Sequence, residues 1–215
     1  MIVSPGRRFI FVHIPKTGGT ALALALEARA RADDILVGDT PKARRRRARL
    51  AGITTAGRLW KHATLADGIG LYTETQARDW FTFTLVRNPW DRMVSYYHWL
   101  RGQSFAHPAV TLAQSLDFAG FVNHPQTAAS IAATPYGSYL RLADGTEAAT
   151  AFLRLEHLQE DGAALEAHLG FRLFPLARAN ASDRRADWRF YYDDRTAEQV
   201  ARIAAADIAR FGYAF

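Results

Sequence analysis

A lysine, two threonines and a glycine pair lie close together early in the chain. They form Lys16–Thr20 (KTGGT), which comes shortly after the apolar run Arg8–Ile14. A glycine pair between a buried strand and a helix lets backbone N–H groups converge on an anion, and the helix N-terminus adds partial positive charge. Lys16 supplies a full charge, and the hydroxyls of Thr17 and Thr20 can donate hydrogen bonds to phosphate or sulfate oxygens. The sequence therefore predicts an anion-binding loop.

A second polar cluster follows another apolar run, Phe81–Val86. Arg87 comes directly after this run, at the end of a predicted strand, where ligands collect in open α/β sheets. Ser95 lies about two turns into the helix that Pro89 is expected to begin. A guanidinium and a hydroxyl placed in this way can clamp one phosphate from two sides. The alternative is a capped amphipathic helix with arginines in surface ion pairs.

Alternating strands and helices are needed to hold these two clusters. The apolar runs predict strands at 8–14, 81–86 and 151–155, and helix signals predict helices from the anion loop to about 31, from 89 onward, over about 159–169 and over about 196–210. Asn88 can cap the second of these helices. This order predicts an α/β fold of three layers, with a central, largely parallel sheet flanked by helices.

The composition narrows the class of protein. A chain of 215 residues that is 49% hydrophobic can bury the core of a single domain, here residues 1–215. The absence of cysteine excludes disulfide frameworks, thiolate metal sites and a cysteine nucleophile. No apolar run has the length of a membrane span or of a signal peptide, so we expect a cytoplasmic protein without a transmembrane segment.

The charge of the chain favours an anionic partner, because the formal net charge is +6. Arg44–Arg49 contains five arginines and lies in a segment of poor apolar periodicity, residues 40–57. We expect this segment to be an exposed basic excursion rather than a domain boundary. It can attract an anionic acceptor or polymer, although a solvated basic face is the simpler interpretation.

The two clusters together resemble the sulfotransferase superfamily. The matching motifs are His13–Thr20 (HIPKTGGT) and Val86–Ser95 (VRNPWDRMVS), with further similarity at 152–158 (FLRLEHL), 180–182 (NAS) and 207–215 (DIARFGYAF). Within that superfamily the chain is most similar to bacterial and Golgi carbohydrate sulfotransferases, including relatives of heparan sulfate 2-O-sulfotransferase. The resemblance implies a P-loop-like sulfotransferase fold.

The resemblance also implies an activity and its site. The expected reaction moves a sulfuryl group from 3′-phosphoadenosine 5′-phosphosulfate (PAPS) to a hydroxyl, leaves 3′,5′-diphosphoadenosine (PAP) and needs no metal. Contacts to the 5′-phosphosulfate are expected from Lys16, Thr17, Gly18, Gly19, Thr20 and Ala21, with Lys16 also stabilising the departing phosphate. Contacts to the 3′-phosphate are expected from Arg87 and Ser95, and the segment with Ser182 and Arg184 is expected to close over the nucleotide.

An alcohol acceptor loses its proton as it attacks, so a base is expected, and histidine suits this task near neutral pH. The resemblance nominates His62, because related sequences carry their catalytic histidine region between the two donor motifs. His13 lies inside an apolar strand, where a hydrogen-bonded structural role is favoured. His98 follows two tyrosines on the second helix and can face the cleft. His62 is therefore the first candidate base, with His13 and His98 as alternatives.

Two other functions compete with sulfuryl transfer. A P-loop phosphoryl transferase places its lysine after the glycines, whereas Lys16 precedes them. A non-catalytic module could bind an anionic polymer through Arg44–Arg49, but the sequence has no recognised nucleic-acid-binding signature, so no nucleic-acid partner is expected. For a sulfotransferase, family analogy favours a saccharide or glycolipid acceptor.

Overall fold

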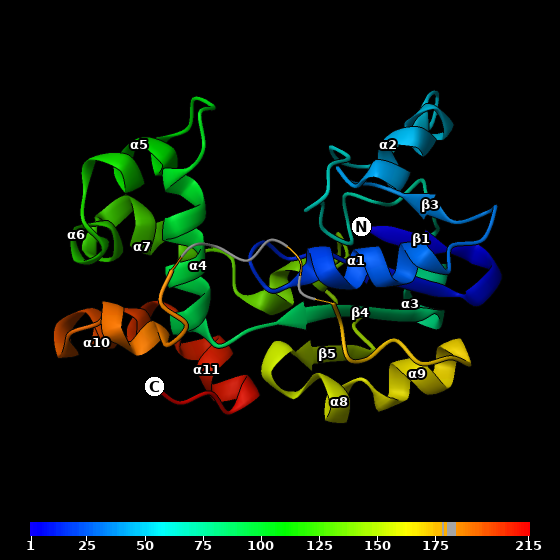
Figure 1. The fold of residues 1–215 in the computed structure, drawn as a ribbon. Coiled ribbons are helices and arrows are strands. Elements are labelled where there is room, and N and C mark those ends of the chain that lie inside the picture. Colours follow the sequence, from blue (N-terminus) through cyan, green and yellow to red (C-terminus); the bar gives the residue numbers. More distant parts are fainter. Residues whose placement is uncertain (178, 180–183) are drawn as a thin grey trace. The chain divides into compact units, whose positions relative to one another are not determined.

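The computed structural model describes residues 1–177, 179 and 184–215 (Figure 1). Residue contacts divide the chain into two compact units. The first unit comprises Met1–Val86 and Tyr136–Asn180, and the second comprises Arg87–Pro135 and Ala181–Phe215. That residues 1–215 behave as a single domain stays a prediction.

A five-stranded sheet forms the centre of the first unit. Its strands are β1 (Ile2–Ser4), β2 (Phe9–Val12), β3 (Ile35–Leu36), β4 (Phe81–Val86) and β5 (Ala151–Arg154), in the order β3-β1-β2-β4-β5. The pairs β2/β4 and β4/β5 are parallel, whereas β1 is antiparallel to both β2 and β3. Only β1 therefore runs against the other strands, and the predicted α/β fold with a largely parallel sheet is confirmed.

Helices join and cover these strands in the first unit (Figure 1). They are η1 (Pro5–Arg7), α1 (Gly19–Ala28), α2 (Pro41–Arg46), η2 (Arg47–Leu50), α3 (Glu74–Asp79), η3 (Tyr136–Leu140), η4 (Leu155–His157), α8 (Leu158–Asp161) and α9 (Ala163–Leu169). The predicted helix over about 159–169 is thus divided between α8 and α9. Gly162 separates them, and it packs so closely on Phe174 that a Cβ would overlap the phenyl ring.

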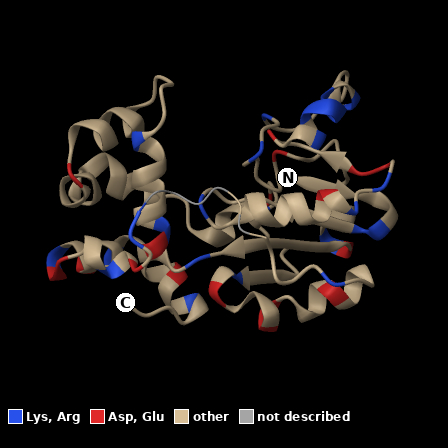
Figure 2. Cartoon of the chain, in the orientation of Figure 1, with Lys and Arg blue, Asp and Glu red and all other residues tan. Residues whose placement is uncertain are grey.

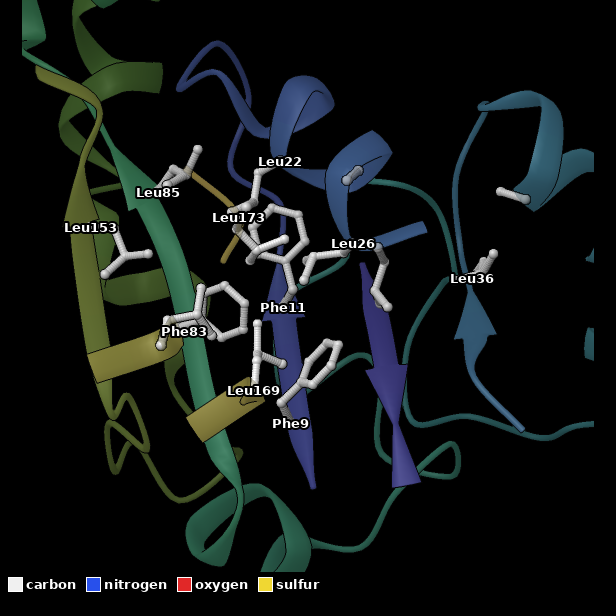
Figure 3. Close-up of a cluster of buried hydrophobic side chains, with 14 residues drawn as sticks. Phe9, Phe11, Leu22, Leu26, Leu36, Phe83, Leu85, Leu153, Leu169 and Leu173 are labelled. Atoms are coloured by element: carbon white, nitrogen blue, oxygen red, sulfur yellow. The ribbon is translucent and has the colours of Figure 1, made fainter. Parts of the chain in front are cut away.

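Alternate residues of β2 and β4 build one face of the core of the first unit. Phe9 and Phe11 lie two residues apart, so both project to the same face, where Phe83 and Leu85 of β4 join them. Figure 3 shows these side chains in one cluster with leucines from α1 and α9. This packing fixes the carboxyl end of β2, where the anion loop begins.

The second unit is helical among its described residues. Its helices are α4 (Pro89–Arg101), α5 (Pro108–Ser115), α6 (Phe118–Asn123), α7 (Pro125–Ala132), η5 (Trp188–Tyr191), α10 (Asp194–Ile203) and α11 (Ala205–Phe211). The sequence prediction contained no helix between Arg101 and Tyr136. We attribute this to the lengths of α5, α6 and α7, which have six to eight residues and show too few turns for a clear periodicity.

The start of α4 matches its sequence prediction. The Asn88 side chain accepts hydrogen bonds from the backbone N–H groups of Trp90, at 3.0 Å, and Asp91, at 3.3 Å. Pro89 occupies the first helical position, where a missing N–H costs nothing. The helix that carries Ser95 therefore begins at a fixed residue.

The basic excursion is ordered by its own arginines. Arg46 donates hydrogen bonds to the carbonyls of Arg31, at 2.8 Å, and Asp34, at 3.1 Å, and Arg49 donates to Ala32 at 2.6 Å. These two side chains anchor α2 and η2 beside β3, so the segment is more than the solvated face expected of it. Figure 2 shows basic residues gathered on α2. Separately, among the helices described, none combines the length and apolar composition needed to cross a membrane.

Candidate active site

The anion loop bends through two residues with left-handed backbone conformation. Lys16 has φ 67° and Gly18 has φ 87°. Glycine adopts this region without steric cost, but a lysine there carries strain that the surrounding structure must support. After these two residues the chain enters α1 at Gly19, whose first N–H groups have no partners within the helix. Strand, turn and helix N-terminus are thus arranged as the sequence predicted.

The Thr17 side chain closes the loop from inside. Its hydroxyl is fully buried and donates to the carbonyl of Ile14 at 3.0 Å. This differs from the expectation that the hydroxyl donates to a bound anion, because its proton is already engaged. Thr17 can still offer a backbone N–H, and the anion contact expected of the partly exposed Thr20 stays a prediction.

Gly18 and Gly19 have a packing role that the sequence analysis did not specify. A Cβ at position 19 would lie 2.5 Å from Nε2 of His13 and closer still to Cδ2, and a Cβ at position 18 would lie 2.7 Å from Leu155. Real Cβ contacts are not this short, so either site accepts a side chain only if its neighbours move. The start of α1 thus lies directly against the His13 ring.

His62, the first candidate base, is joined to the same loop. Its Nδ1 lies 2.7 Å from the backbone carbonyl oxygen of His13. A carbonyl can only accept, so Nδ1 carries the proton and Nε2 keeps its lone pair when the ring is neutral. A single hydrogen bond thus orients the ring and leaves Nε2 as the nitrogen that can accept a proton.

Burial keeps both histidines neutral. It lowers the pKa of His62 to about 4, although the hydrogen bond to the His13 carbonyl acts in the opposite direction. It also holds the pKa of His13 well below its usual range, with further lowering by His62 and the nearby lysines. His13 follows β2, which ends at Val12, and packs on Phe11 with ring centroids 5.8 Å apart. Its structural role stays a prediction.

The second cluster centres on a carboxylate that holds two arginines. Arg87 donates to Oδ2 of Asp91 from Nε at 2.9 Å and from Nη2 at 2.6 Å. Arg184 donates to the other oxygen, Oδ1, at 2.7 Å. All three side chains are largely buried. Asp91 therefore brings together two cations that are 97 residues apart in sequence (184 minus 87).

Ser95 belongs to the same helix face as Asp91, because four residues make about one helical turn. It is buried. The Asp91 carboxylate joins Arg87 and Arg184, whereas a shared phosphate contact with Ser95 stays a prediction. Ser182, the remaining predicted ligand, lies outside the described residues.

His98 lies on α4 in the second unit, whereas His62 and His13 belong to the first. Its ring stands edge-on to Tyr191 with centroids 5.0 Å apart. Among the described residues, none hydrogen-bonds its buried Nε2 atom. Burial lowers its pKa, with additional effects from Arg184 and Arg101.

Asp91 is the main site residue that the sequence analysis missed. Its carboxylate lies in the first turn of α4, where a negative charge also complements the helix dipole. The four-residue spacing to Arg87 could have indicated the first ion pair. Nothing in the sequence indicated the second pair, since Arg184 reaches Asp91 only through the tertiary fold.

One comparison with known proteins, with a protein-family model, identifies the family. The model of the sulfotransferase family named Sulfotransfer_2 matches residues 1–214. A crystal structure of mouse sulfotransferase SULT7A1 complexed with PAP aligns with a TM-score of 0.47 and 14% sequence identity, over 93% of this chain and 82% of that chain. A search of curated proteins found no match.

The match over nearly the whole length shows that the chain belongs to the sulfotransferase family. The predicted enzyme class, a PAPS-dependent sulfotransferase, and the predicted sulfuryl transfer are thereby confirmed. The closer similarity to heparan sulfate 2-O-sulfotransferase stays a prediction, as do the roles of individual residues.

Proposed function

We propose that the chain transfers the sulfuryl group of PAPS to a saccharide hydroxyl, with His62 as the general base. One observation carries the assignment of the base: the His13 carbonyl fixes the Nδ1 proton of His62 and leaves Nε2 able to accept a proton. The same His13 packs against Gly19, so the base and the donor loop share one support. Both belong to the first unit.

The proposed donor site has two parts. Lys16, the backbone N–H groups of residues 17–21 and the Thr20 hydroxyl bind the 5′-phosphosulfate, with the N-terminus of α1 adding positive charge. Arg87 and Arg184, held by Asp91, bind the 3′-phosphate together with Ser95. Ser182 is retained as a proposed ligand from the family resemblance alone.

In the proposed reaction, the acceptor oxygen forms a bond to sulfur while the bond from sulfur to the bridging phosphate oxygen breaks. That electron pair stays on the 5′-phosphate of PAP, and the acceptor proton passes to Nε2 of His62. Lys16 and the helix N-terminus stabilise the charge that grows on the departing phosphate. Fixed dipoles and cations supply this stabilisation, so no metal is required by the proposal.

Nucleotide-dependent melting tests the donor assignment. PAP should raise the melting temperature in the presence of a chelator, because a ligand that binds only the folded state stabilises it, by about 2.7 kcal/mol at 100 times its Kd. ATP with magnesium is the control and should stabilise less. The reverse ranking would favour a phosphoryl transferase.

A transfer screen tests the acceptor. Labelled PAPS should pass its sulfuryl group to saccharides in preference to lipids, phenols and peptides. Transfer only to a phenol or peptide would contradict the saccharide assignment while leaving the sulfotransferase class intact. A cytoplasmic location and similarity to the 2-O-sulfotransferase branch are proposed on the sequence alone.

A further inference from the structure

Phe215 packs on three aromatic side chains of the second unit. Its ring centroid lies 5.6 Å from that of Trp90, 5.2 Å from that of Trp188 and 5.5 Å from that of Tyr192. The ring planes meet at 76°, 77° and 88° in the same order, and such edge-to-face contacts are a favoured geometry for aromatic pairs. The side chain of Phe215 is nevertheless 47% exposed, so these contacts rather than burial in a core hold the ring in place.

The three partners of Phe215 come from two different segments of that unit. Trp90 lies in the first turn of α4, whereas Trp188 begins η5 and Tyr192 follows it. The indole planes of Trp90 and Trp188 are nearly parallel, at 10°, with ring centroids 6.4 Å apart. The Tyr192 hydroxyl donates to the Trp90 carbonyl at 2.8 Å. Phe215 therefore completes a set of contacts that joins the start of α4 to η5.

The backbone next to Phe215 is tied to the cap of α4. Asn88 donates from Nδ2 to the carbonyl of Ala214 at 3.0 Å, while its Oδ1 accepts the two N–H groups at the start of the helix. Asn88 directly follows Arg87 in the sequence. One side chain thus connects the helix cap to a residue 126 positions away, beside an arginine of the proposed 3′-phosphate site.

Both arginines of that site lie next to these contacts. Arg184 precedes Trp188 by four residues (188 minus 184), and Arg87 directly precedes the cap of α4. Both guanidiniums donate to Asp91. A phosphate would compete with this carboxylate for the guanidiniums, and a site that is ordered in advance loses less conformational entropy when it binds. The short link to Trp188 therefore restricts how far Arg184 can move.

We propose that Phe215 is a positioning residue of the 3′-phosphate site. Its ring holds the segment that carries Arg184 against the start of α4, which carries Asp91 and directly follows Arg87. Both guanidiniums are then in place before PAP binds. The inference rests on the proposed function, because it concerns the site proposed there for the 3′-phosphate. Phe215 itself is assigned no contact with the nucleotide and acts through Arg184.

Calorimetric titration of the full chain with PAP and with adenosine 5′-phosphosulfate tests this role, because only PAP carries the 3′-phosphate. Phe215→Ala should weaken PAP binding about 5–10-fold more than binding of the other nucleotide, which lies within the range of coupling between contacting residues. Phe215→Tyr keeps the ring and should retain the parental PAP affinity. Phe105→Ala is the matched control and should change neither affinity, because Phe105 is also 47% exposed and belongs to the same unit.

A double-mutant cycle separates positioning from a general loss of structure. In an Arg184→Ala background, Phe215→Ala should have no further effect on PAP affinity, because the side chain that it positions is absent. Independent effects on the fold would instead multiply the two losses. Thermal melting verifies that each variant is folded. Phe215→Leu keeps an apolar side chain without a ring, and it takes the place of Phe215→Ala in the cycle if the alanine variant does not fold.

Three results would overturn the inference: parental PAP affinity in a folded Phe215→Ala variant, equal losses for the two nucleotides, or losses that multiply in the double variant. The single variant Arg184→Ala distinguishes this failure from failure of the proposed function. If Arg184→Ala weakens PAP selectively while Phe215→Ala does not, only the positioning role is wrong. If neither Arg184→Ala nor Arg87→Ala discriminates between the nucleotides, the proposed 3′-phosphate site is wrong and the positioning role is wrong with it.

Discussion

The two parts of the proposed donor site depend on different chemical groups. The anion loop depends on backbone geometry: two left-handed residues, a buried threonine and a glycine with no room for a methyl group. The 3′-phosphate cluster depends on side-chain charges, with Arg87 and Arg184 held by Asp91. Added side-chain volume should therefore destabilise the loop, whereas the loss of a charge should weaken phosphate binding by the cluster.

The largest effect is expected at the base. His62→Ala should lower turnover by about 10²–10⁴-fold, the usual contribution of a positioned general base, while PAP affinity stays nearly unchanged. Single-turnover transfer and PAP titration measure the two quantities. His157→Ala, which removes an exposed histidine, is the control. Parental turnover in His62→Ala, together with loss in a folded His98→Ala or His13→Ala variant, would assign the base elsewhere.

Removing a charge from the second cluster should selectively weaken binding of the nucleotide that carries a 3′-phosphate. Arg87→Ala should weaken PAP about 10–100-fold more than it weakens adenosine 5′-phosphosulfate, because only PAP carries the 3′-phosphate and hydrogen bonds to charged groups contribute about 1.5–3 kcal/mol. Ser95→Ala should show the same preference at about fivefold.

Calorimetric titration with both nucleotides measures this selectivity. Arg195→Ala, an exposed arginine of the same unit, should leave both affinities unchanged. Equal losses for the two nucleotides in Arg87→Ala would show that the 3′-phosphate lies elsewhere.

Adding one methyl group to the loop tests its dependence on volume. Gly19→Ala should destabilise the protein by about 1–3 kcal/mol, the usual cost of overpacking, because the Cβ overlaps the His13 ring. Gly38→Ala is the control, since its Cβ would meet Ala43 at an ordinary 3.9 Å. Denaturant unfolding gives the free energies. Combining Gly19→Ala with His13→Ala should cost less than the sum of the single changes; strict additivity would contradict the packing argument.

The smallest effect on kcat/KM is expected from a change of pH. The pKa of His62 is lowered to about 4, so the base stays neutral from pH 8 to well below 6 and kcat/KM should change little there. Activity should fall as the pH falls through about 4. An activity loss centred near the ordinary histidine pKa would contradict the buried, neutral base.

The same shift predicts a stability change with a definite sign. Between about pH 6.5 and 4, His62 binds a proton in the unfolded chain but not in the folded one, so the free energy of unfolding falls as the pH falls. Melting curves should show this fall more strongly in the parent than in His62→Gln.

Much of the site could be predicted because its elements are local. These elements depend on neighbouring residues, whose preferences are visible in the sequence. They are the cap of Asn88, the turn through Gly18 and the strands 9–12 and 81–86. The helices between Arg101 and Tyr136 could not be predicted in this way. Their short amphipathic patterns become helices only where tertiary packing stabilises them.

By itself the sequence determined the family, the anion loop, the position of Arg87 at a strand end and the candidacy of His62. The tertiary structure alone decided which groups meet: the His62 ring with the His13 carbonyl, the His13 ring with Gly19, and Arg184 with Asp91. Residues far apart in the chain come together only through the packing of the folded core, and burial, which lowers the pKa of His62, exists only in that fold.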